Sequence, residues 1–486
     1  MARCLAVSIL VVDVGTSSVR ASVIRPDGTV AGVRRASVGA RSPAPGIVEL
    51  DAVALAAGTL DVARAAIAEV GAVDAVAIAS QRATTIVWDR TTGEPVGPGI
   101  GWQDLRTAGR CLALAAEGLR LAPNQSATKL ALLLDTHDPS RSRDLCFGTV
   151  DSWLAWTLSG SALHVTDATN AAVTGLVLLD GSAWDPHALG VLGVPPSVMP
   201  AIVDSAGVVG PALALPGSPP IAGIVGDQQG SMIGQGCLAA GQAKATFGTG
   251  AMLDCSTGLE RPAFAVTGES GTFPIVTRRM SGTVHWGIEA IMLSAGSCVE
   301  WLRDSLGLVS NASETDAIAA SVRDSGGVTF VPALGGLGTP VWDFGARGTL
   351  VGISASTTRA EVVRAVLEGV AQRAADLCAA VEADSGRAIE RLRVDGGMIA
   401  NATFVQALAD AIRRPVDLAP VTEATTLGAA YLAGVAVGTW GSLAEATTTA
   451  EPRAAVEPRR RLDRERWLDA RARAQATVPA MTAIRF

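Results

Sequence analysis

The beginning of the chain alternates short apolar runs with turn-forming residues. Residues 8–14 are a β-branched run that Gly15-Thr16-Ser17-Ser18 interrupts, and a second apolar run, 19–24, follows. The turn Arg25-Pro26-Asp27-Gly28 then leads into a third run that begins at Thr29. Apolar runs of this length, bounded by Gly, Pro, Ser and Asp, are typical of strands joined by tight turns. The pattern therefore predicts three antiparallel strands.

The same strand–turn–strand pattern recurs in the second half of the chain. In residues 241–256 a Gly-Thr turn again separates two apolar runs. A repeat of this kind predicts an internal duplication, with two similar α/β lobes facing a central cleft and a boundary near residues 236–241. We expect an N-terminal domain over residues 1–238 and a C-terminal domain over residues 239–486. On the hairpins alone, chance similarity is an equal alternative, because short Gly-Thr hairpins are common.

The remaining periodicity completes an α/β pattern. Residues 52–69, 402–412 and 426–437 have the composition and spacing of helices, and residues 73–80 and 392–394 predict buried strands. The two kinds of element alternate along the chain, as in α/β proteins.

The tail of the chain predicts a different kind of helix. Residues 459–473 alternate charges and carry the apolar side chains Leu462, Trp467 and Leu468. We interpret this segment as a solvated helix with i,i+4 ion pairs, in preference to a binding patch.

Apolar stretches elsewhere do not predict membrane insertion. Residues 4–12 could suggest a signal peptide, but Asp13 ends the run, and a buried strand is the better interpretation. The uncharged stretches 205–226 and 424–444 are broken by prolines in the first and diluted by glycines and threonines in the second. Neither is typical of a membrane span.

Composition narrows the classes of function. Hydrophobic residues make up 49% of the chain and charged residues 17%, which fits a globular protein with large cores. The net charge of −7 argues against nucleic acid as the main partner, since binding phosphates needs a basic surface. The 7 cysteines form no CxxC pair and predict a reduced, cytoplasmic setting, and the 4 histidines have no metal-like spacing.

The first hairpin supplies groups of the kind that bind phosphate. Small residues in a tight turn let backbone N–H groups approach phosphate oxygens, and hydroxyls add donors. Asp13, just before the turn, could hold Mg²⁺ through water, because oxygen ligands suit that ion. An ordinary β-hairpin is the alternative. The expected nucleotide contacts of this segment are Gly15, Thr16, Ser17, Ser18 and Arg20.

A carboxylate follows another predicted strand near the lobe boundary. The motif Gly226-Asp227-Gln228-Gln229-Gly230 comes directly after the apolar residues 221–225. Ligand clefts of α/β proteins form at the carboxyl ends of strands. Asp227 could therefore take the proton from an attacking hydroxyl. A helix-capping aspartate is the alternative for this residue.

Two motifs in the second half are further candidates for nucleotide contacts. Phe247-Gly248-Thr249-Gly250 is placed to contact phosphates from the second lobe. In the motif from Asp395 to Asn401, the glycines would let a flat adenine lie against the backbone, and Asn401 could hydrogen-bond its edge. A plain strand–turn–helix is the alternative.

The order and spacing of these motifs resemble the FGGY carbohydrate kinase family, and most closely its glycerol-kinase-like branch. The resemblance covers nearly the whole chain. It implies two duplicated ribonuclease-H-like lobes, as in actin, hexokinase and heat-shock chaperone ATPases, with Mg-ATP between them and closure upon substrate. The matching segments are 13–20, 81–82, 84–89, 102–103, 165–170, 226–236, 246–250, 296–304, 331–340, 347–348, 393–401 and 426–434.

Carried over position by position, the resemblance assigns roles to the candidate residues. Asp227 matches the catalytic base and Asp13 the Mg²⁺-associated carboxylate, while Thr16 and Thr249 fall on the two phosphate hairpins. The expected ATP contacts of the second half are Gly248, Thr249, Gly250, Gly296, Glu300, Gly397 and Asn401. The expected contacts of the acceptor, a small polyol or sugar, are Arg82, Gln103, Asp227 and Gln228.

The chain departs from glycerol kinases where the acceptor is held. Their Gln-Arg-Glu is Gln81-Arg82-Ala83 here, and their tyrosine before Ser-Gly-Thr-Lys-Leu falls on Asn124. A lost buried hydrogen bond weakens binding by about 0.5–1.5 kcal/mol. We therefore expect the freed volume to admit an acceptor larger than glycerol, a longer polyol or a ketose.

Two other classes of function remain open at this point. One is a non-catalytic ATP- or sugar-binding regulator on the same fold, which would require a broken phosphate site. The other is a chaperone-like or actin-like ATPase, which has no use for the acceptor residues Arg82, Gln103 and Gln228. The resemblance also makes a homodimer plausible.

Overall fold

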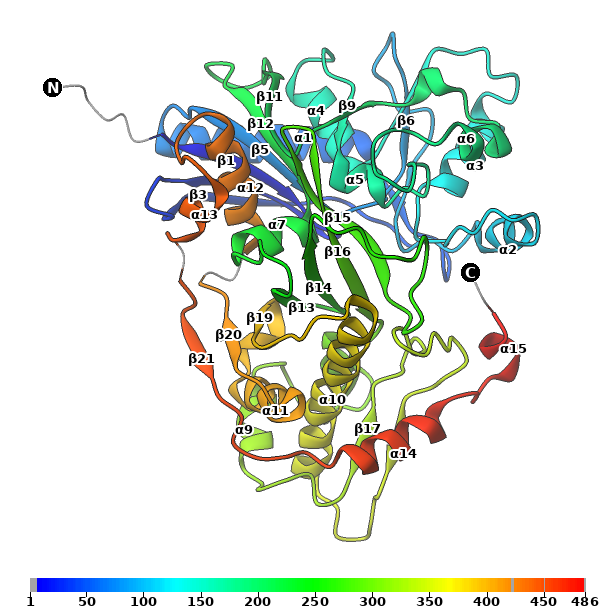
Figure 1. Cartoon of the computed structure of the whole chain (residues 1–486), viewed down its shortest axis with the longest axis vertical. Coiled ribbons are helices and arrows are strands. Elements are labelled where there is room, and N and C mark those ends of the chain that lie inside the picture. The colour runs from blue at the N-terminus through cyan, green and yellow to red at the C-terminus, as the bar shows by residue number, and fades with distance from the viewer. Residues whose placement is uncertain (1–6, 421–423, 450, 485–486) are drawn as a thin grey trace, which may run out of the picture.

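The computed structural model of the chain describes residues 7–420, 424–449 and 451–484. It has two lobes, one above the other in Figure 1. A single 13-stranded sheet runs through both lobes in the order β21-β20-β19-β13-β14-β16-β15-β11-β12-β5-β1-β2-β3. Its two halves meet where β11 and β15 pair.

The N-terminal half of the sheet begins with the predicted antiparallel strands. β1 pairs with β2 and β2 with β3, all antiparallel. β1 then pairs in parallel with β5, β5 in parallel with β12, and β12 antiparallel with β11. These strands are β1 (Ile9–Val14), β2 (Ser18–Ile24), β3 (Val30–Ser37), β5 (Ala75–Ser80), β11 (Ala206–Pro211) and β12 (Pro220–Gly226).

The C-terminal half repeats the same ladder. β13, β14 and β16 are antiparallel, β13, β19 and β20 are parallel, and β21 is antiparallel to β20. β15 adds a strand beside β16. The repeated pairing order confirms the duplication that the two hairpins predicted. These strands are β13 (Ala243–Phe247), β14 (Ala251–Gly258), β15 (Phe273–Met280), β16 (Thr283–Met292), β19 (Leu392–Asp395), β20 (Val416–Leu418) and β21 (Ala454–Val456).

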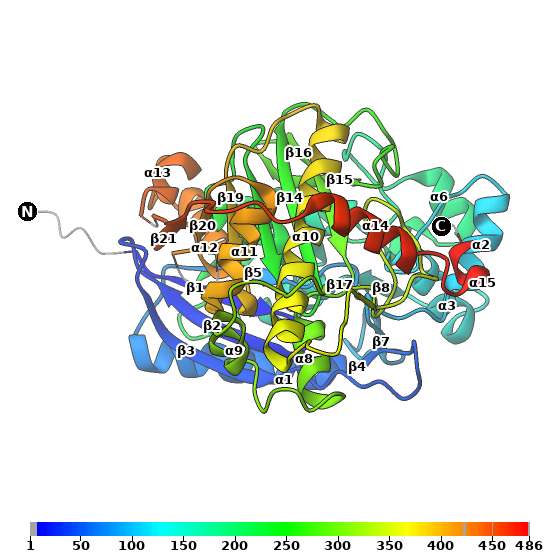
Figure 2. The same cartoon turned by 90° about the horizontal axis from the view of Figure 1, so that it is seen from below.

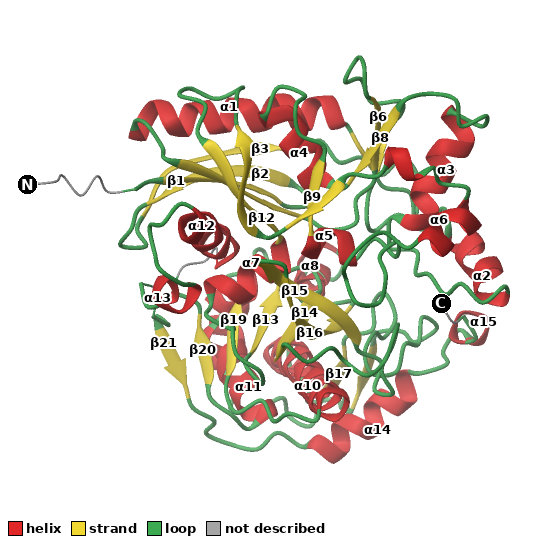
Figure 3. Cartoon of the chain, turned by 45° about the horizontal axis from the view of Figure 1, so that its top comes forward, coloured by secondary structure: helices red, strands yellow, loops and turns green. Residues whose placement is uncertain are grey.

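Helices cover the sheet where its apolar side chains point. α1 (Ala52–Val70) and α4 (Val150–Leu158) bury one face of β1 and β5, and α10 (Arg359–Ser385) and α11 (Ala402–Ile412) bury β13 and β19. α12 (Ala424–Ala436) crosses back to the N-terminal half. It packs on the other face of β1, β5 and β12, with α13 (Leu443–Thr447) beside it (Figures 1 and 3).

α12 approaches α7 (Asp227–Gly234) closely because glycines face each other across the contact. A Cβ atom on Gly428 would lie 1.9 Å from the carbonyl oxygen of Gly230, and one on Gly234 would lie 1.9 Å from that of Ala424. Neither position has room for any side chain. The helix that begins at Asp227 is therefore held against a helix from the far end of the chain.

Shorter elements complete the lobes. In the described residues no helix is both long and apolar enough to cross a membrane. The six described cysteines are buried and unpaired. The remaining elements are β4 (Glu49–Leu50), β6 (Ile86–Asp89), β7 (Gly99–Ile100), β8 (Leu145–Gly148), β9 (Val165–Asp167), β10 (Ala201–Val203), β17 (Thr329–Val331), β18 (Thr349–Val351), α2 (Ala108–Ala116), α3 (Ala127–His137), α5 (Ala168–Ala172), α6 (Pro186–Leu192), α8 (Gly296–Asp304), α9 (Glu314–Ala320), α14 (Arg464–Ala474) and α15 (Pro479–Thr482).

The tail helix α14 differs from its prediction. It begins at Arg464, because Asp463 caps it, and it lies across the C-terminal lobe (Figure 2). Trp467 is 1% exposed, and Arg464 and Arg471 both pair with the buried Asp376 of α10. The prediction of a solvated helix is wrong for this face, because Trp467 is buried and the two arginines pair with α10, whereas the predicted i,i+4 ion pair is present between Arg473 and Asp469.

Candidate active site

Strand register brings the candidate residues of the N-terminal half to one edge of the sheet. Val14 of β1 and Gly226 of β12 both align with Ser80 of β5. The three strands are parallel, so the Gly15 turn, Arg82 and Asp227 follow at the same carboxyl edge. This is the arrangement expected of Asp227 from its place after a strand.

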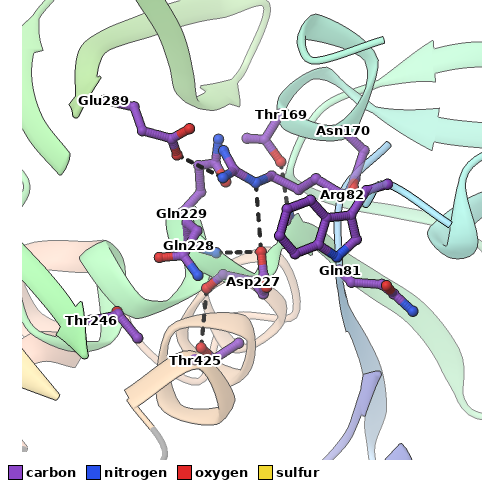
Figure 4. A network of polar contacts seen from close by, with 12 residues as sticks. Gln81, Arg82, Thr169, Asn170, Asp227, Gln228, Gln229, Thr246, Glu289 and Thr425 are labelled. Carbon is purple, nitrogen blue, oxygen red and sulfur yellow. Dashed lines mark hydrogen bonds and ion pairs between the residues drawn. The ribbon is translucent and has the colours of Figure 1, made fainter. Parts of the chain in front are cut away.

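Arg82 lies between two carboxylates, one from each lobe. Its Nη2 donates to Glu289 Oε2 of β16 at 2.6 Å, and its Nε lies 3.6 Å from Asp227 Oδ1 (Figure 4). The Asp227 side chain is 29% exposed and that of Arg82 only 11%. Arg82 Nη1 is buried without a hydrogen-bond partner among the described residues. The site therefore presents one accessible carboxylate and one unused cationic donor.

Burial and pairing act differently on the two ends of the Arg82–Glu289 pair. Burial raises the pKa of Glu289 to about 7, although Arg82 opposes this shift. Burial also disfavours the charge on Arg82, but Glu289, Asp227 and Asp254 together outweigh it and raise its pKa. A cation that faces several carboxylates keeps its charge.

The first hairpin forms the predicted tight turn. Gly15 N–H donates to Ser18 O at 3.0 Å, and the Gln81 side chain donates to Gly15 O at 3.2 Å. Trp102 Nε1 lies 3.4 Å from Thr16 Oγ1, which links the turn to the segment carrying Gln103. Asp13 and Arg20 lie opposite each other in the β1–β2 register, with Ser17 exposed at the tip of the turn.

The second hairpin is braced by the start of α8. Gly248 N–H donates to Gly250 O, Gly296 N–H donates to Gly248 O, and both distances are 2.9 Å. A Cβ atom on Gly296 would lie 2.6 Å from Gly248 O, so the close approach requires glycine there. Thr249, at the tip, is exposed, as is Glu300 one turn further along α8.

The motif after β19 packs against this hairpin. Gly396 has φ 92°, and a Cβ atom there would lie 2.4 Å from Phe247 O, whereas one on Gly397 would meet nothing within 4 Å. This open backbone fits the predicted adenine surface. Asn401 has another use, because its Oδ1 accepts from Phe404 N–H at the start of α11 and its Nδ2 donates to Thr315. Its contact with adenine stays a prediction.

The residues predicted to contact the substrate differ in exposure and in their hydrogen-bond partners. Gln103 is exposed. The Gln228 amide oxygen accepts from Lys244 Nζ at 2.6 Å, and Lys244 also pairs with Asp254 at 2.7 Å. Lys244 and Asp254 are fully buried, so this contact holds the Gln228 side chain against the C-terminal half of the sheet. Only the amide nitrogen of Gln228 is left to contact the substrate.

The positions that depart from glycerol kinases have distinct surroundings. Ala83 is buried with φ 60°, and its carbonyl accepts from Ser126 Oγ at 3.0 Å. Asn124 is exposed.

Sequence reasoning missed two charged residues of the site. Glu289 lies inside an apolar strand, and Lys129 is fully buried in α3, where its Nζ donates to Gly101 O at 2.8 Å and Trp102 O at 3.0 Å. Burial lowers the pKa of Lys129 to about 7. One signal was available, since Lys129 and Lys244 are the only lysines in the sequence and each stands in an apolar run.

The side chains fit a nucleotide-borne magnesium ion. Across the part of the chain that the structure describes, no group of three or more His, Cys, Asp or Glu residues could hold a metal. Mg²⁺ commonly needs only one or two carboxylates, with water and substrate phosphates completing its shell. Asp13, at the edge of the first hairpin, meets that lesser requirement.

The chain belongs to the FGGY family of carbohydrate kinases. The model of the family's N-terminal domain matches residues 8–234, and that of its C-terminal domain matches residues 243–437. The glycerol kinase of Aromatoleum aromaticum is 44% identical over 90% of this chain and 91% of its own. The glycerol kinase of Deinococcus radiodurans is 42% identical over 89% of this chain and 90% of its own.

Solved structures agree with this assignment. A glycerol kinase of Plasmodium falciparum with ADP has a TM-score of 0.88 and 27% identity, and the match covers 99% of both chains. A xylulose kinase of Lactobacillus acidophilus, with a TM-score of 0.82 over 96% of each chain, is 19% identical and shows the fold alone. The chain is therefore an ATP-using carbohydrate kinase, which removes the chaperone-like and non-catalytic alternatives. No comparison supports an acceptor larger than glycerol.

Proposed function

We propose that the chain transfers the γ-phosphoryl group of Mg-ATP to a hydroxyl group of glycerol. The observation that carries the proposal is the pairing of the accessible Asp227 carboxylate with Arg82, whose buried Nη1 has no hydrogen-bond partner among the described residues. An unpaired buried donor is costly unless a ligand meets it. Glycerol as the acceptor is supported by similarity to glycerol kinases at 42–44% identity.

In the proposed reaction, Asp227 accepts the proton of the attacking hydroxyl. As the new bond forms between that oxygen and the γ-phosphorus, the bond to the β,γ-bridging oxygen breaks and ADP leaves. The two hairpins, which carry Thr16 and Thr249, supply donors to the phosphate oxygens. Asp13 would hold Mg²⁺, which would neutralise negative charge on those oxygens. Positioning and charge stabilisation account for most of the catalysis of phosphoryl transfer.

Three polar groups are available to bind glycerol, although the residues at positions 83 and 124 differ from those of glycerol kinases. Arg82 Nη1 and the Gln228 amide nitrogen can donate hydrogen bonds to glycerol, and the Asp227 carboxylate can accept one. Three polar groups match the three hydroxyls of glycerol in number. Because Asn124 is exposed and Ala83 is small, we expect weaker glycerol binding than in relatives that keep both polar contacts, and no change of acceptor class.

An assay of ADP release tests the proposal across glycerol, erythritol, xylitol and xylulose. We expect the highest kcat/KM with glycerol and phosphate on a terminal hydroxyl. A tetritol, pentitol or pentulose as the best acceptor would contradict glycerol and restore the pocket-enlargement hypothesis. Removing Mg²⁺ with EDTA should abolish release, and adding Mg²⁺ should restore it. The homodimer and the cytoplasmic setting stay predictions, of which light scattering tests the first.

A further inference from the structure

A buried threonine contacts the backbone N–H of Gly226, the residue before Asp227. Gly226 N–H donates to Thr169 Oγ1 at 2.8 Å, and Gly226 caps the helix whose first residue is Asp227. Thr169 belongs to α5, 57 residues earlier in the chain, and is fully buried. Figure 4 shows its hydroxyl directed toward the start of α7. A side chain remote in sequence therefore holds the backbone next to the proposed base.

Asp167 fixes the direction of this hydroxyl. Thr169 Oγ1 donates to Asp167 Oδ1 at 2.8 Å. A hydroxyl has one proton, so its use toward Asp167 leaves the oxygen free to accept from Gly226. The fully buried Asp167 carboxylate also accepts from Asn170 Nδ2 at 2.9 Å and from Ser205 Oγ at 2.7 Å. These donors keep the carboxylate in one orientation.

A second threonine holds the other side of the same backbone. Thr425 Oγ1 of α12 donates to Asp227 O at 3.0 Å. Gly226 N–H and Asp227 C=O are thus held by hydroxyls from two different elements. A general base must lie within hydrogen-bond reach of the proton it takes, and a misplacement of about 1 Å can cost roughly a hundredfold in rate.

We propose that Thr169 is a positioning residue for the phosphoryl-transfer step. Its hydrogen bond to Gly226 sets the place of the Asp227 carboxylate, and Asp167 sets the direction of the Thr169 hydroxyl. The inference rests on the proposed role of Asp227 as base. It gives the fully buried Asp167 and Thr169 a function in catalysis.

Thr169→Val, which keeps the shape and removes the hydroxyl, tests the proposal, and Thr169→Ser is the rescue. We expect Thr169→Val to lower kcat by roughly tenfold to a hundredfold with KM for ATP close to the wild-type value. Thr169→Ser should keep most of kcat even where it lowers stability. Thr166→Val is the matched control, because the buried Thr166 hydroxyl donates to Asp151 at 2.8 Å and does not contact Gly226. Equal losses of kcat in Thr169→Val and Thr166→Val, or no rescue by serine, would overturn the proposal.

Hydrogen exchange separates this inference from the proposed function. Without any substrate, the Gly226 amide proton should exchange faster in Thr169→Val than in the wild type. Its exchange rate in Thr166→Val should equal that of the wild type. Unaltered Gly226 exchange in Thr169→Val would overturn the positioning role even in an active glycerol kinase. Inactivity of the wild type with every acceptor would instead refute the proposed function. If Thr169→Val does not fold, Thr169→Cys, with a weakly accepting sulfur, takes its place with the same expected losses.

Discussion

Arg82 and Glu289, which are 207 positions apart in the chain, form an ion pair that joins the two lobes, with 2.6 Å between Nη2 and Oε2. Both side chains are about nine-tenths buried, at 11% and 8% exposure. Because the same guanidinium faces Asp227, the pair fixes the cation beside the proposed base. A contact between lobes thereby sets the charge arrangement of the site.

The first prediction concerns this pair. Glu289→Ala removes the nearer carboxylate partner of the buried Arg82 and leaves Asp227 at 3.6 Å, so it should lower the free energy of unfolding, by at most roughly 3–5 kcal/mol. It should also raise KM for the acceptor, since Arg82 is then free to turn toward Asp227. Urea denaturation and steady-state kinetics measure the two effects. The control is Arg473→Ala, which removes an exposed pair with Asp469 and should cost about 0.5 kcal/mol or less. Similar losses in both variants would contradict the account.

The second prediction concerns the contact between α7 and α12. Gly428→Ala places a methyl group against the Gly230 carbonyl, so we expect a loss of roughly 1–3 kcal/mol in stability and a lower kcat, because α7 begins at Asp227. Gly109→Ala in α2 is the matched control, since a Cβ atom there meets nothing within 4 Å. That variant should be neutral or gain about 0.4–1 kcal/mol. A neutral Gly428→Ala variant would show that the helices are not closely packed.

The third prediction concerns pH. Burial, and then the charge of Asp167, raise the pKa of Asp151 from 3.8 to about 7 in the folded chain. Between these values the folded state binds more protons than the unfolded state, so stability falls as pH rises, by at most about 1.4 kcal/mol per pH unit. Asp151→Asn should remove this fall. Denaturation at several pH values from 4 to 8 measures the difference between wild type and variant. A difference that does not vary with pH would contradict the shifted pKa.

The hairpins and the residues at strand ends were predictable because their chemistry is local. A Gly-Thr turn between β-branched runs defines a hairpin by itself, and parallel pairing then places Asp227 and Arg82 at one edge. Even the duplication could be inferred, since both halves begin with such a hairpin.

Long-range partners could not be predicted in the same way. Nothing near Glu289 in the sequence indicates that it faces Arg82, and nothing in the Thr169 segment indicates a contact with Gly226. At Trp467 the local pattern predicted the wrong environment. The alternating charges around it indicated a solvent-exposed helix, but its indole is buried in the C-terminal lobe. The packing of elements that are distant in the sequence decides these contacts, and the local pattern does not contain them.

The most direct test of the account is phosphoryl transfer to glycerol by Asp227→Asn, compared with the wild-type chain in one assay of Mg-ATP turnover. We predict robust glycerol-dependent ADP release by the wild type. Asp227→Asn should lose nearly all of this activity, with ATP binding preserved in calorimetry. Asparagine keeps the size of the side chain but cannot accept the hydroxyl proton. Near-wild-type turnover in Asp227→Asn would contradict the assignment of Asp227 as the base.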